Sequence, residues 1–419
     1  MNKRANSIKA QHIAVLLPSL AGGGAERSML HLVRSFIERG RRVDLLLCRA
    51  KGPLLDGVPE AARIQALKPE SALRGRLMAA LANASPSGIR SLLRPVLLPV
   101  KTDADIRHID SLKHYLKDVR PDVLLSALTY TNLLALWAKQ LSGVSVPVVV
   151  SERIALSVHM KNEGRHRGWR WRYLMPAVSH AYRSSNGIVA VSDSVARDLA
   201  EKAHIDRNSI KTIYNPVVDS AMLELADAPL EHPWFKAGAP PVVLAVGRLI
   251  AQKDFQTLIR AFAVLLRKRK ARLVILGQGR QRTELESLAE ELGIATDVDM
   301  PGFVSNPYQY MARASAFALT SLYEGLPGVL IQALACGCPV VSTDCPGGSA
   351  EILDHGKYGR LVPINNDTVL AAAMDSLLNE QTDKDMLRKR AALFSVAGAT
   401  QRYLDYLDTI VYRNRHTAL

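Results

Sequence analysis

The residues best suited to chemistry lie in two loops of the second half of the chain, and they carry opposite charges. The stretch VGRLIAQKD places Arg248 and Lys253 between a predicted strand and a predicted helix. Arginine forms bidentate hydrogen bonds to phosphate, and lysine supplies a compact positive charge. Two such cations at the carboxyl end of one strand suit a diphosphate. A solvated loop is the alternative, in which Lys253 simply neighbours Asp254 at the start of the helix.

The second loop carries a single acid and leads into an apolar helix. In SLYEGLPGVLIQALACGCPVV, Pro327 suits the first helical position, where its missing N–H is not needed. Glu324 therefore lies in the loop, and Gln332 lies about five residues into the helix, roughly 7.5 Å along its axis. A ligand with its phosphates at the helix start would place a neighbouring ribose beside Gln332. An ordinary loop and helix would also account for this stretch.

Two further turns are rich in glycine. LAGGGAERS, residues 20–28, follows the first predicted strand and opens a helix, so its backbone can approach an anion closely. It is not G-x-G-x-x-G, and no acidic residue ends the second strand, so we do not expect a nicotinamide site. A plain tight turn is the alternative. LGQG (276–279) is a similar turn, and MPGFVSN (300–306) is a short strand and turn whose backbone could read a base edge.

The elements that must position these residues alternate between apolar strands and amphipathic helices. The predicted strands are 12–18, 42–48, 122–128, 146–151, 186–192, 241–247, 271–277, 316–321 and 339–343. The predicted helices are 25–40, 193–203, 254–269, 280–292, 327–336 and 366–380. Buried strands alternating with helices predict parallel sheets covered on both faces. We therefore expect an α/β fold of two Rossmann-like domains, with ligands at the carboxyl ends of the strands.

The predicted domains are residues 1–220 and 221–395, followed by a helix over 396–419 that we expect to return to the first domain. YNPVVD ends the first domain, and ADAPLEHPWFKAGAPP is a linker rich in proline, glycine and alanine. The chain has 419 residues, of which 48% are hydrophobic and 22% charged, which is typical of globular proteins.

Charge is distributed unevenly along the chain. Residues 1–211 contain 33 lysines and arginines against 17 acids, whereas residues 212–419 contain 21 against 22. The first half therefore carries the whole excess, which suggests an anionic partner such as a membrane surface, a phosphorylated acceptor or a nucleic acid. The N-terminal stretch has no apolar core of a signal peptide, and no run of 18 apolar residues exists, so neither a leader nor a membrane span is expected. The four cysteines predict reduced core thiols and no metal site.

The order and spacing of these motifs strongly resemble the GT-B glycosyltransferases of retaining family 4. The resemblance covers essentially the whole chain and rests on GGGAE, YNPV, GRL…K, LGQG, GF, EGLP, LACGCPVVSTDCPGG and GRLVP. It implies two Rossmann-like domains facing across a cleft, with a nucleotide-sugar on the C-terminal domain and the acceptor on the N-terminal domain. It also implies a retaining, metal-independent sugar transfer with no cofactor, for which a UDP-sugar is the default donor.

The resemblance assigns roles to individual residues. Arg248 and Lys253 hold the donor diphosphate, and Glu324 contacts the transferred sugar. The donor-binding residues that it implies are Gly23, Gly24, Gly247, Gly277, Phe303, Gly325, Leu326, Pro327, Gly328, Val329 and Gln332. The departing diphosphate is stabilised by the two cations and the helix N-terminus, and the acceptor hydroxyl attacks from the leaving-group face without a protein nucleophile.

Gln332 departs from the family pattern. The second Glu of the E-x7-E motif binds the ribose hydroxyls, and an amide can accept a hydrogen bond from only one of them. We expect a loss of about 1–2 kcal/mol in donor binding if nothing compensates. The alternative function is a catalytically silent protein that binds sugar nucleotides or acts as a scaffold. Retention of Arg248, Lys253 and Glu324 speaks against it.

On the acceptor side, SERIALSVHM offers Glu152, Arg153 and His159 as candidates, and for His159 a surface histidine is an equal alternative. Two segments, 73–101 and 161–173, concentrate positive charge. Trp interleaved with Arg suits a lipid headgroup interface, and the second segment contains the membrane-surface candidates Arg165, Arg167, Trp169, Arg170, Trp171 and Arg172. Nucleic-acid stacking and a helix with a Trp core face are the alternatives. We expect an enzyme on the inner face of the cytoplasmic membrane with a polyprenyl-diphosphate-linked or glycan acceptor in envelope polysaccharide assembly, and no nucleic-acid partner.

Overall fold

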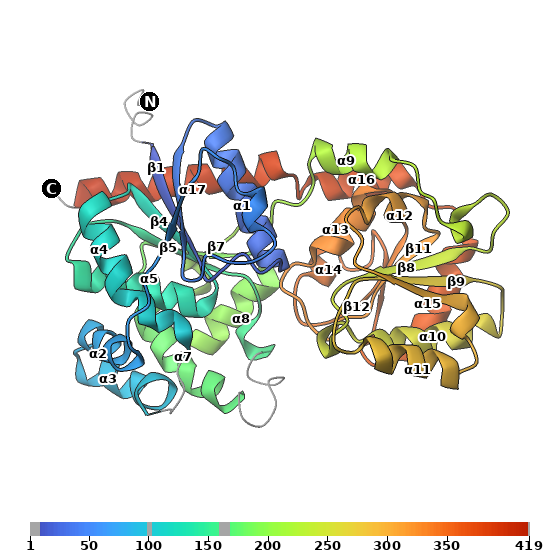
Figure 1. Cartoon of the computed structure of the whole chain (residues 1–419), viewed down its shortest axis with the longest axis horizontal. Coiled ribbons are helices and arrows are strands. Elements are labelled where there is room, and N and C mark those ends of the chain that lie inside the picture. Colours follow the sequence, from blue (N-terminus) through green and yellow to red (C-terminus); the bar gives the residue numbers. More distant parts are fainter. Residues whose placement is uncertain (1–8, 99–102, 159–167, 418–419) are drawn as a thin grey trace. The chain divides into compact units, whose positions relative to one another are not determined.

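The computed structural model describes residues 9–98, 103–158 and 168–417 (Figure 1). The chain divides into two compact units. The first comprises Met1–Pro216 and Val396–Leu419, and the second comprises Val217–Ser395. The boundary after Pro216 lies four residues before the one expected from the sequence, and the segment after Ser395 belongs to the first unit.

A parallel sheet of seven strands forms the centre of the first unit. The strands are β1 His12–Leu17, β2 Arg42–Leu47, β3 Arg63–Ala66, β4 Val123–Ala127, β5 Val148–Glu152, β6 Gly187–Ala190 and β7 Ile210–Thr212. They lie in the order β3-β2-β1-β4-β5-β6-β7. The order reverses between β1 and β4, and open α/β sheets bind ligands outside the carboxyl ends of the strands at such a switch point.

Helices cover both faces of this sheet, which is why its interior strands β1, β4, β5 and β6 are mostly apolar and buried. They are α1 Gly24–Glu38, α2 Ala72–Ala82, α3 Pro86–Leu92, α4 Ile109–Val119, α5 Thr129–Ser142, α7 Gly168–Tyr182, α8 Asp193–Ala203 and α17 Val396–Thr417, with short turns η1 Leu55–Gly57, η2 Leu93–Leu97, η3 Ala104–His108 and η4 Arg207–Ser209. Alternate strand residues pack with α1 and α17 into one core. Helix α5 packs against β1, β4 and β5 and also contacts α4 and α7 (Figure 1).

The final helix, α17, is an integral part of the first unit. Asp408 accepts hydrogen bonds from the backbone N–H of Ala10 at 2.7 Å and from Nη2 of Arg41 at 3.1 Å. Tyr403 and Leu407 are fully buried in the core that α17 shares with the sheet. The helix therefore completes one face of a domain whose other elements precede residue 217.

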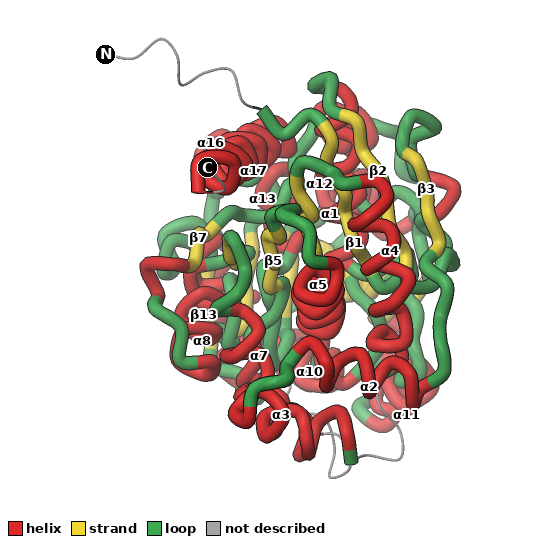
Figure 2. The backbone as a smooth tube through the Cα atoms, turned by 90° about the vertical axis from the view of Figure 1, so that its left-hand side faces the viewer, coloured by secondary structure: helices red, strands yellow, loops and turns green. Residues whose placement is uncertain are grey.

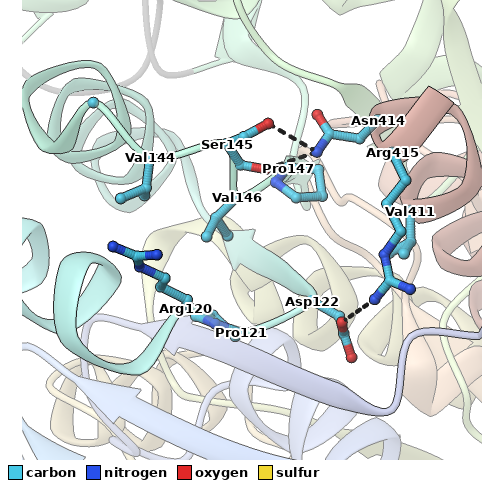
Figure 3. Close-up of a pocket in the computed structure, with 11 residues that line it drawn as sticks. Arg120, Pro121, Asp122, Val144, Ser145, Val146, Pro147, Val411, Asn414 and Arg415 are labelled. Carbon is cyan, nitrogen blue, oxygen red and sulfur yellow. Dashed lines mark hydrogen bonds and ion pairs between the residues drawn. The ribbon is translucent and has the colours of Figure 1, made fainter. Parts of the chain in front are cut away.

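A surface depression of about 420 Å³ lies where the end of α17 meets the sheet (Figure 3). It is lined by Arg120, Pro121, Asp122, Gly143, Val144, Ser145, Val146, Pro147, Val411, Asn414 and Arg415. Its polar groups are largely paired, since Arg415 bonds Asp122 at 2.7 Å and Nδ2 of Asn414 donates to the Ser145 carbonyl at 2.7 Å. Asp122 immediately precedes β4, so the depression lies at the amino ends of the strands, opposite to the expected ligand edge.

The second unit is built around a parallel sheet of six strands. Its strands are β8 Val242–Val246, β9 Arg272–Leu276, β10 Val298–Gly302, β11 Ala316–Leu319, β12 Val340–Thr343 and β13 Arg360–Val362, in the order β10-β9-β8-β11-β12-β13. The order reverses between β8 and β11, which places the switch point of this sheet at the carboxyl ends of those two strands.

The helices of the second unit flank this sheet and bury an apolar core of their own. They are α9 Ser220–Asp227, α10 Phe255–Leu266, α11 Arg282–Glu291, α12 Tyr308–Arg313, α13 Gly328–Ala335, α14 Ser349–Ile352, α15 Asp367–Asn379 and α16 Lys384–Ala392, with short turns η5 Pro233–Phe235, η6 Ala251–Lys253 and η7 Ala295–Asp297. Across the described ranges of both units, no helix is long and apolar enough to cross a membrane.

Candidate functional site

The two chemically suggestive loops meet at the switch point of the second sheet. The loop that carries Arg248 and Lys253 follows β8, and the loop that carries Glu324 follows β11, the neighbouring strand. Backbone and side-chain hydrogen bonds join the loops: the Leu322 N–H donates to the Gln252 carbonyl at 2.8 Å, and Nε2 of Gln252 donates to the Tyr323 carbonyl at 3.0 Å. The strand order thus brings together residues that are 71 positions apart.

Lys253 and Glu324 form an ion pair at the centre of this arrangement. Nζ of Lys253 lies 2.5 Å from Oε1 of Glu324, and the two side chains are only 14% and 10% exposed. The Ser321 hydroxyl donates a second hydrogen bond to the same oxygen, at 2.6 Å. Removing charges from water is costly, so charged side chains at largely buried positions are normally paired, as these two are.

Arg248 and the start of α13 present the anion-binding groups. Arg248 is exposed, and among the described residues its guanidinium has no hydrogen-bond or ion-pair partner. Pro327 is the N-cap of α13, and the helix begins at Gly328, one residue later than expected. The first N–H groups of a helix have no partner within it, so those of Gly328 and Val329 are available to a negative charge.

Glycines allow the turns around the site to approach one another closely. At Gly277, φ is +144° and a Cβ would lie 1.8 Å from the Gly247 carbonyl oxygen. At Gly347, φ is +134° and a Cβ would lie 2.2 Å from the Glu324 carbonyl oxygen. These two contacts hold the loops that carry Arg248 and Glu324 against neighbouring turns, which explains why glycine is required there.

The residues expected at the nucleoside end are open to solvent. Phe303 follows β10 and its side chain is 64% exposed, next to a turn in which the Gly277 N–H donates to the Gly302 carbonyl at 2.8 Å. Gln332 lies in the second turn of α13 and is half-buried. Among the described residues its side-chain amide has no hydrogen-bond partner, so it is available to a ligand.

In the first unit, the glycine loop lies at the switch point of its own sheet. Gly23 is the N-cap of α1, and Gly24 is its first residue. Arg153, which follows β5, is buried and donates to the Ser28 hydroxyl in α1 at 2.6 Å. The Ser28 hydroxyl in turn donates to Oδ1 of Asn215 at 3.2 Å. Arg153 therefore supports the helix behind the glycine loop.

Glu152 lies at the end of β5 and is also buried, with 1% of its surface exposed. It accepts hydrogen bonds from Thr129 at 3.1 Å, from Asn132 at 3.3 Å and from the Tyr182 hydroxyl. Burial raises the pKa of its carboxyl to about 7, although these hydrogen bonds act in the opposite direction. Glu152 therefore joins β5 to α5 and α7 inside the unit and does not line an open surface. His159 lies outside the described residues.

The membrane-surface hypothesis for residues 165–172 requires a correction at Trp171. Its side chain is only 8% exposed and packs edge to face on Tyr130, with ring centroids 5.5 Å apart. Trp171 thus belongs to the core because α7 packs its apolar face against α5. Arg165 and Arg167 lie outside the described residues, as do the side chains of Trp169, Arg170 and Arg172.

Some residues of the site were not singled out from the sequence. Ser321 and Gln252 each lie within three residues of a predicted site residue, so their positions in the sequence could have identified them as neighbours of the site. Tyr182 and Asn132 gave no such signal, because their contact with Glu152 depends on the packing of α5 and α7. All four cysteines are buried free thiols, and burial raises the pKa of each of them. Over the described part of the chain, no three His, Cys, Asp or Glu residues gather into a possible metal site.

Two family models match the chain, one on each unit. Residues 22–220 match Glycosyltransferase Family 4, and residues 230–394 match Glycosyl transferases group 1. The second match contains the Lys253–Glu324 pair and the start of α13. The first contains the glycine loop and Arg153.

Curated relatives agree with these matches. An N-acetylgalactosaminyltransferase of Campylobacter jejuni that is named for a diphospho-undecaprenol acceptor is 31% identical over 287 residues, which is 67% of this chain and 74% of that protein. The lipopolysaccharide core biosynthesis glycosyltransferase LpsE of Rhizobium meliloti is 26% identical over 92% of this chain and 96% of its own length.

Solved structures share the whole architecture. The lipopolysaccharide outer core galactosyltransferase WaaB in its apo form has a TM-score of 0.68 at 18% identity, covering 97% of this chain and 100% of that one. HepE of Anabaena, solved with UDP and glucose, has a TM-score of 0.71 at 17% identity, covering 95% of this chain and 100% of that one. The fold is GT-B, as expected from the sequence, and the chain is a glycosyltransferase of family 4, the group 1 type.

Proposed function

We propose that this glycosyltransferase moves a sugar from a UDP-sugar to a lipid-linked acceptor during assembly of an envelope polysaccharide, with retention of anomeric configuration. The observation that carries the proposal is the Lys253–Glu324 pair at the β8/β11 switch point, beside the exposed Arg248 and the start of α13. The Campylobacter relative is named for a diphospho-undecaprenol acceptor, LpsE for lipopolysaccharide core biosynthesis, and HepE was solved with UDP.

The donor diphosphate is bound by fixed positive groups. Arg248 supplies a bidentate fork, Lys253 supplies a point charge, and the amides of Gly328 and Val329 add the partial charge of a helix N-terminus. Charge grows on the diphosphate as the glycosidic bond breaks, so groups that are already oriented stabilise the transition state more than the bound substrate. These cations can take the place of a metal ion, and we propose that the enzyme needs neither metal nor cofactor.

Glu324 has a separate role at the sugar. Its carboxylate pairs with Lys253 and lies in the loop that leads to the start of α13. In the proposed mechanism the acceptor hydroxyl attacks from the face that the diphosphate leaves, and a phosphate oxygen takes its proton. No protein nucleophile forms a covalent intermediate.

We further propose that the enzyme acts as a peripheral protein on the inner face of the cytoplasmic membrane. The excess of positive charge in residues 1–211 supports this placement, because anionic headgroups attract clustered lysine and arginine. A lipid-linked acceptor would be held in the same bilayer.

Thermal denaturation with UDP-, GDP- and ADP-sugars tests the donor assignment. We expect UDP-sugars to raise the melting temperature of the native chain and Arg248→Ala to abolish the rise. Arg267→Ala is the matched control, because Arg267 is exposed at the far end of α10, away from the switch point. Stabilisation by GDP- or ADP-sugars alone would refute the UDP assignment.

Product analysis tests the reaction itself. NMR of the transferred sugar should show the anomeric configuration of the donor, and activity should persist in EDTA. Donor binding without any transfer or donor hydrolysis, across a panel of lipid-diphosphate acceptors, would instead favour a silent sugar-nucleotide-binding protein.

A further inference from the structure

Helix α2 exposes its large apolar side chains. The side chains of Leu73, Leu77 and Leu81 are 75%, 58% and 54% exposed. They are spaced four residues apart, so they form one row on the outer face of the helix, about 12 Å long. A surface helix of a globular domain normally buries its apolar stripe, so this row has no role in the core of the unit.

The inner face of the same helix is built from small residues. Gly75, Ala79 and Ala82 are buried, and α2 packs against η3 and α5. A Cβ at Gly75 would lie 2.9 Å from the Ile106 carbonyl oxygen, so the helix axis lies close to η3. The small inner face lets α2 lie flat on the unit with its leucines outward.

The segment that follows α2 continues the apolar surface. Ile89 in α3, Leu93 in η2 and Leu98 are 37%, 40% and 70% exposed. Helices α2 and α3 lie side by side at one end of the first unit, as Figures 1 and 2 both show. We call the exposed leucines and isoleucine of residues 73–98 the leucine face.

The segment that carries the leucine face is basic. Residues 71–98 contain four arginines and no acidic residue. Arg74 is paired with Asp110 at 2.6 Å, and the Arg94 guanidinium lies 4.6 Å from the ring centre of Tyr173, which is 36% exposed. Arg90 is exposed, and it makes no ion pair with any described residue.

We infer that the leucine face docks on an anionic lipid bilayer, with the leucines in the acyl boundary and the arginines at the headgroups. Charge decides between this occupant and a second copy of the chain. An isologous dimer would bring the exposed Arg90 and Arg94 of one copy against those of the other, and residues 71–98 contain no acid to offset them, whereas an anionic surface offers the opposite sign to both. The bilayer contact therefore belongs to residues 73–98, whereas Trp171 is a core residue.

The segment that carries the leucine face is joined to the expected acceptor edge through η3. The segment between β3 and β4, which includes α2 and η3, leaves the sheet at the carboxyl end of β3. Arg49 follows β2 and forms an ion pair with Asp105 of η3 at 2.5 Å. Both strands end at the same edge as the glycine loop and Arg153, because the sheet is parallel. A bilayer bound to this face would deliver a lipid-linked acceptor to that edge, a step that rests on the proposed function.

Vesicle flotation of the full chain tests the docking itself, without any sugar donor. At low salt we expect binding to vesicles of phosphatidylglycerol and phosphatidylethanolamine and much weaker binding to phosphatidylcholine. Replacing Leu73, Leu77 and Leu81 together by Ser should lower the partition constant on the order of tenfold for each leucine. The matched control replaces the exposed Leu223, Leu225 and Leu393 of the second unit by Ser and should bind like the native chain.

A second pair of variants tests the charge. Arg90→Glu should weaken binding to anionic vesicles several-fold and reduce the salt dependence of that binding. Lys270→Glu is the control, because it reverses the charge of an exposed residue on the second unit, and it should leave binding unchanged. Circular dichroism and melting temperature confirm that the variants are folded.

The inference is overturned if the leucine variant floats as well as the native chain, if the control triple loses binding equally, or if neutral and anionic vesicles bind alike. Sedimentation would overturn it in favour of a second copy if the native chain were a dimer that the leucine variant dissociates. Transfer to a water-soluble acceptor reports separately on the proposed function, and we expect the leucine variant to retain it.

Discussion

Glu324 and Lys253 form an ion pair at a largely buried position. In the proposed mechanism we expect a donor diphosphate to compete with Glu324 for the lysine, which would release Glu324 to contact a sugar hydroxyl. Because the pair already holds Lys253 in place, we expect donor binding to exchange one partner of the lysine for another. Gln332 takes no part in this exchange, because it lies further along α13 and carries no charge.

This difference predicts distinct kinetic defects. Glu324→Ala should lower kcat by about 10²-fold or more, because it removes a group that orients both the lysine and the sugar. Gln332→Ala should mainly raise the donor KM, by about tenfold at most, because only a ribose contact is lost. Steady-state kinetics with varied donor concentration measures both effects.

The variant Gln332→Glu tests the ribose contact in the opposite direction. A carboxylate accepts from both ribose hydroxyls, so this variant should lower the donor KM. The division of roles is wrong if Glu324→Ala and Gln332→Ala show the same pattern of kcat and KM.

Glu152 predicts a pH dependence of stability. Its folded pKa of about 7 lies above the ordinary value of 4.5, because burial penalises the charged carboxylate. The folded chain then binds more protons than the unfolded chain between these values, so this stabilising contribution is full below pH 4.5 and is lost as the pH rises through 7. The free energy of unfolding should fall by roughly 2–3 kcal/mol between pH 5 and pH 8 on account of this group.

Urea unfolding at the two pH values measures this contribution. Glu152→Gln cannot titrate and should show a correspondingly smaller decrease, whereas Glu60→Gln, at an exposed position, should behave like the native chain. An unchanged pH dependence in Glu152→Gln would show that the carboxyl titrates normally.

At the scale of elements, the site depends on how closely its turns approach. Gly277→Ala would place a methyl group 1.8 Å from the Gly247 carbonyl oxygen, so the turn after β9 must move away from the turn after β8. We expect a loss of about 3 kcal/mol or more in stability and a weaker thermal response to the donor.

Gly238→Ala is the control that measures the cost of backbone strain alone, without the steric clash expected at Gly277. Gly238 also has a positive φ, +82°, but a Cβ there meets nothing within 4 Å. It should cost about 1 kcal/mol and leave donor binding intact. Equal losses in the two variants, measured by urea unfolding, would mean that the close approach is unimportant.

The spacing of apolar residues predicted the interior strands and the long amphipathic helices well, because the buried positions of these elements follow a regular local pattern. Helix α8, Asp193–Ala203, has the predicted bounds, and β1 and β2 each end one residue earlier than predicted. Strand β3 was missed because it is a short edge strand whose residues are mostly exposed. The sequence also did not predict which face of α2 is buried. Apolar residues lie all around this helix, so its pattern does not show that the small residues face the interior.

At the scale of the whole molecule, the first unit depends on the last helix of the chain. Leu407 in α17 is fully buried in the core shared with α1 and the sheet. Leu407→Ala should lower the stability of the first unit by about 2–5 kcal/mol. Tyr412→Ala, on an exposed part of the same helix, should cost much less, as urea unfolding would show.

The residues of the proposed donor site could be singled out because they lie in short motifs, but their contacts with one another could not. Lys253 and Glu324 were each identified from their own loop, and only the strand order of the second sheet shows that they touch. The hydrogen bond from Arg153 to Tyr403 joins residues 250 positions apart and has no local signature. Contacts of this kind are set by tertiary packing, which a single sequence does not display.

The position of α17 also determines the order in which the molecule can be completed during synthesis. The ribosome makes residues 217–395 before α17, so the second unit is synthesised in full while the first still lacks its last helix. That helix packs in the same core as Phe36 and contributes Leu407 to it. Domains generally fold in the order in which they emerge, from the N-terminus. Here that order is reversed at the last step, and the unit that begins the chain is the one that is finished last.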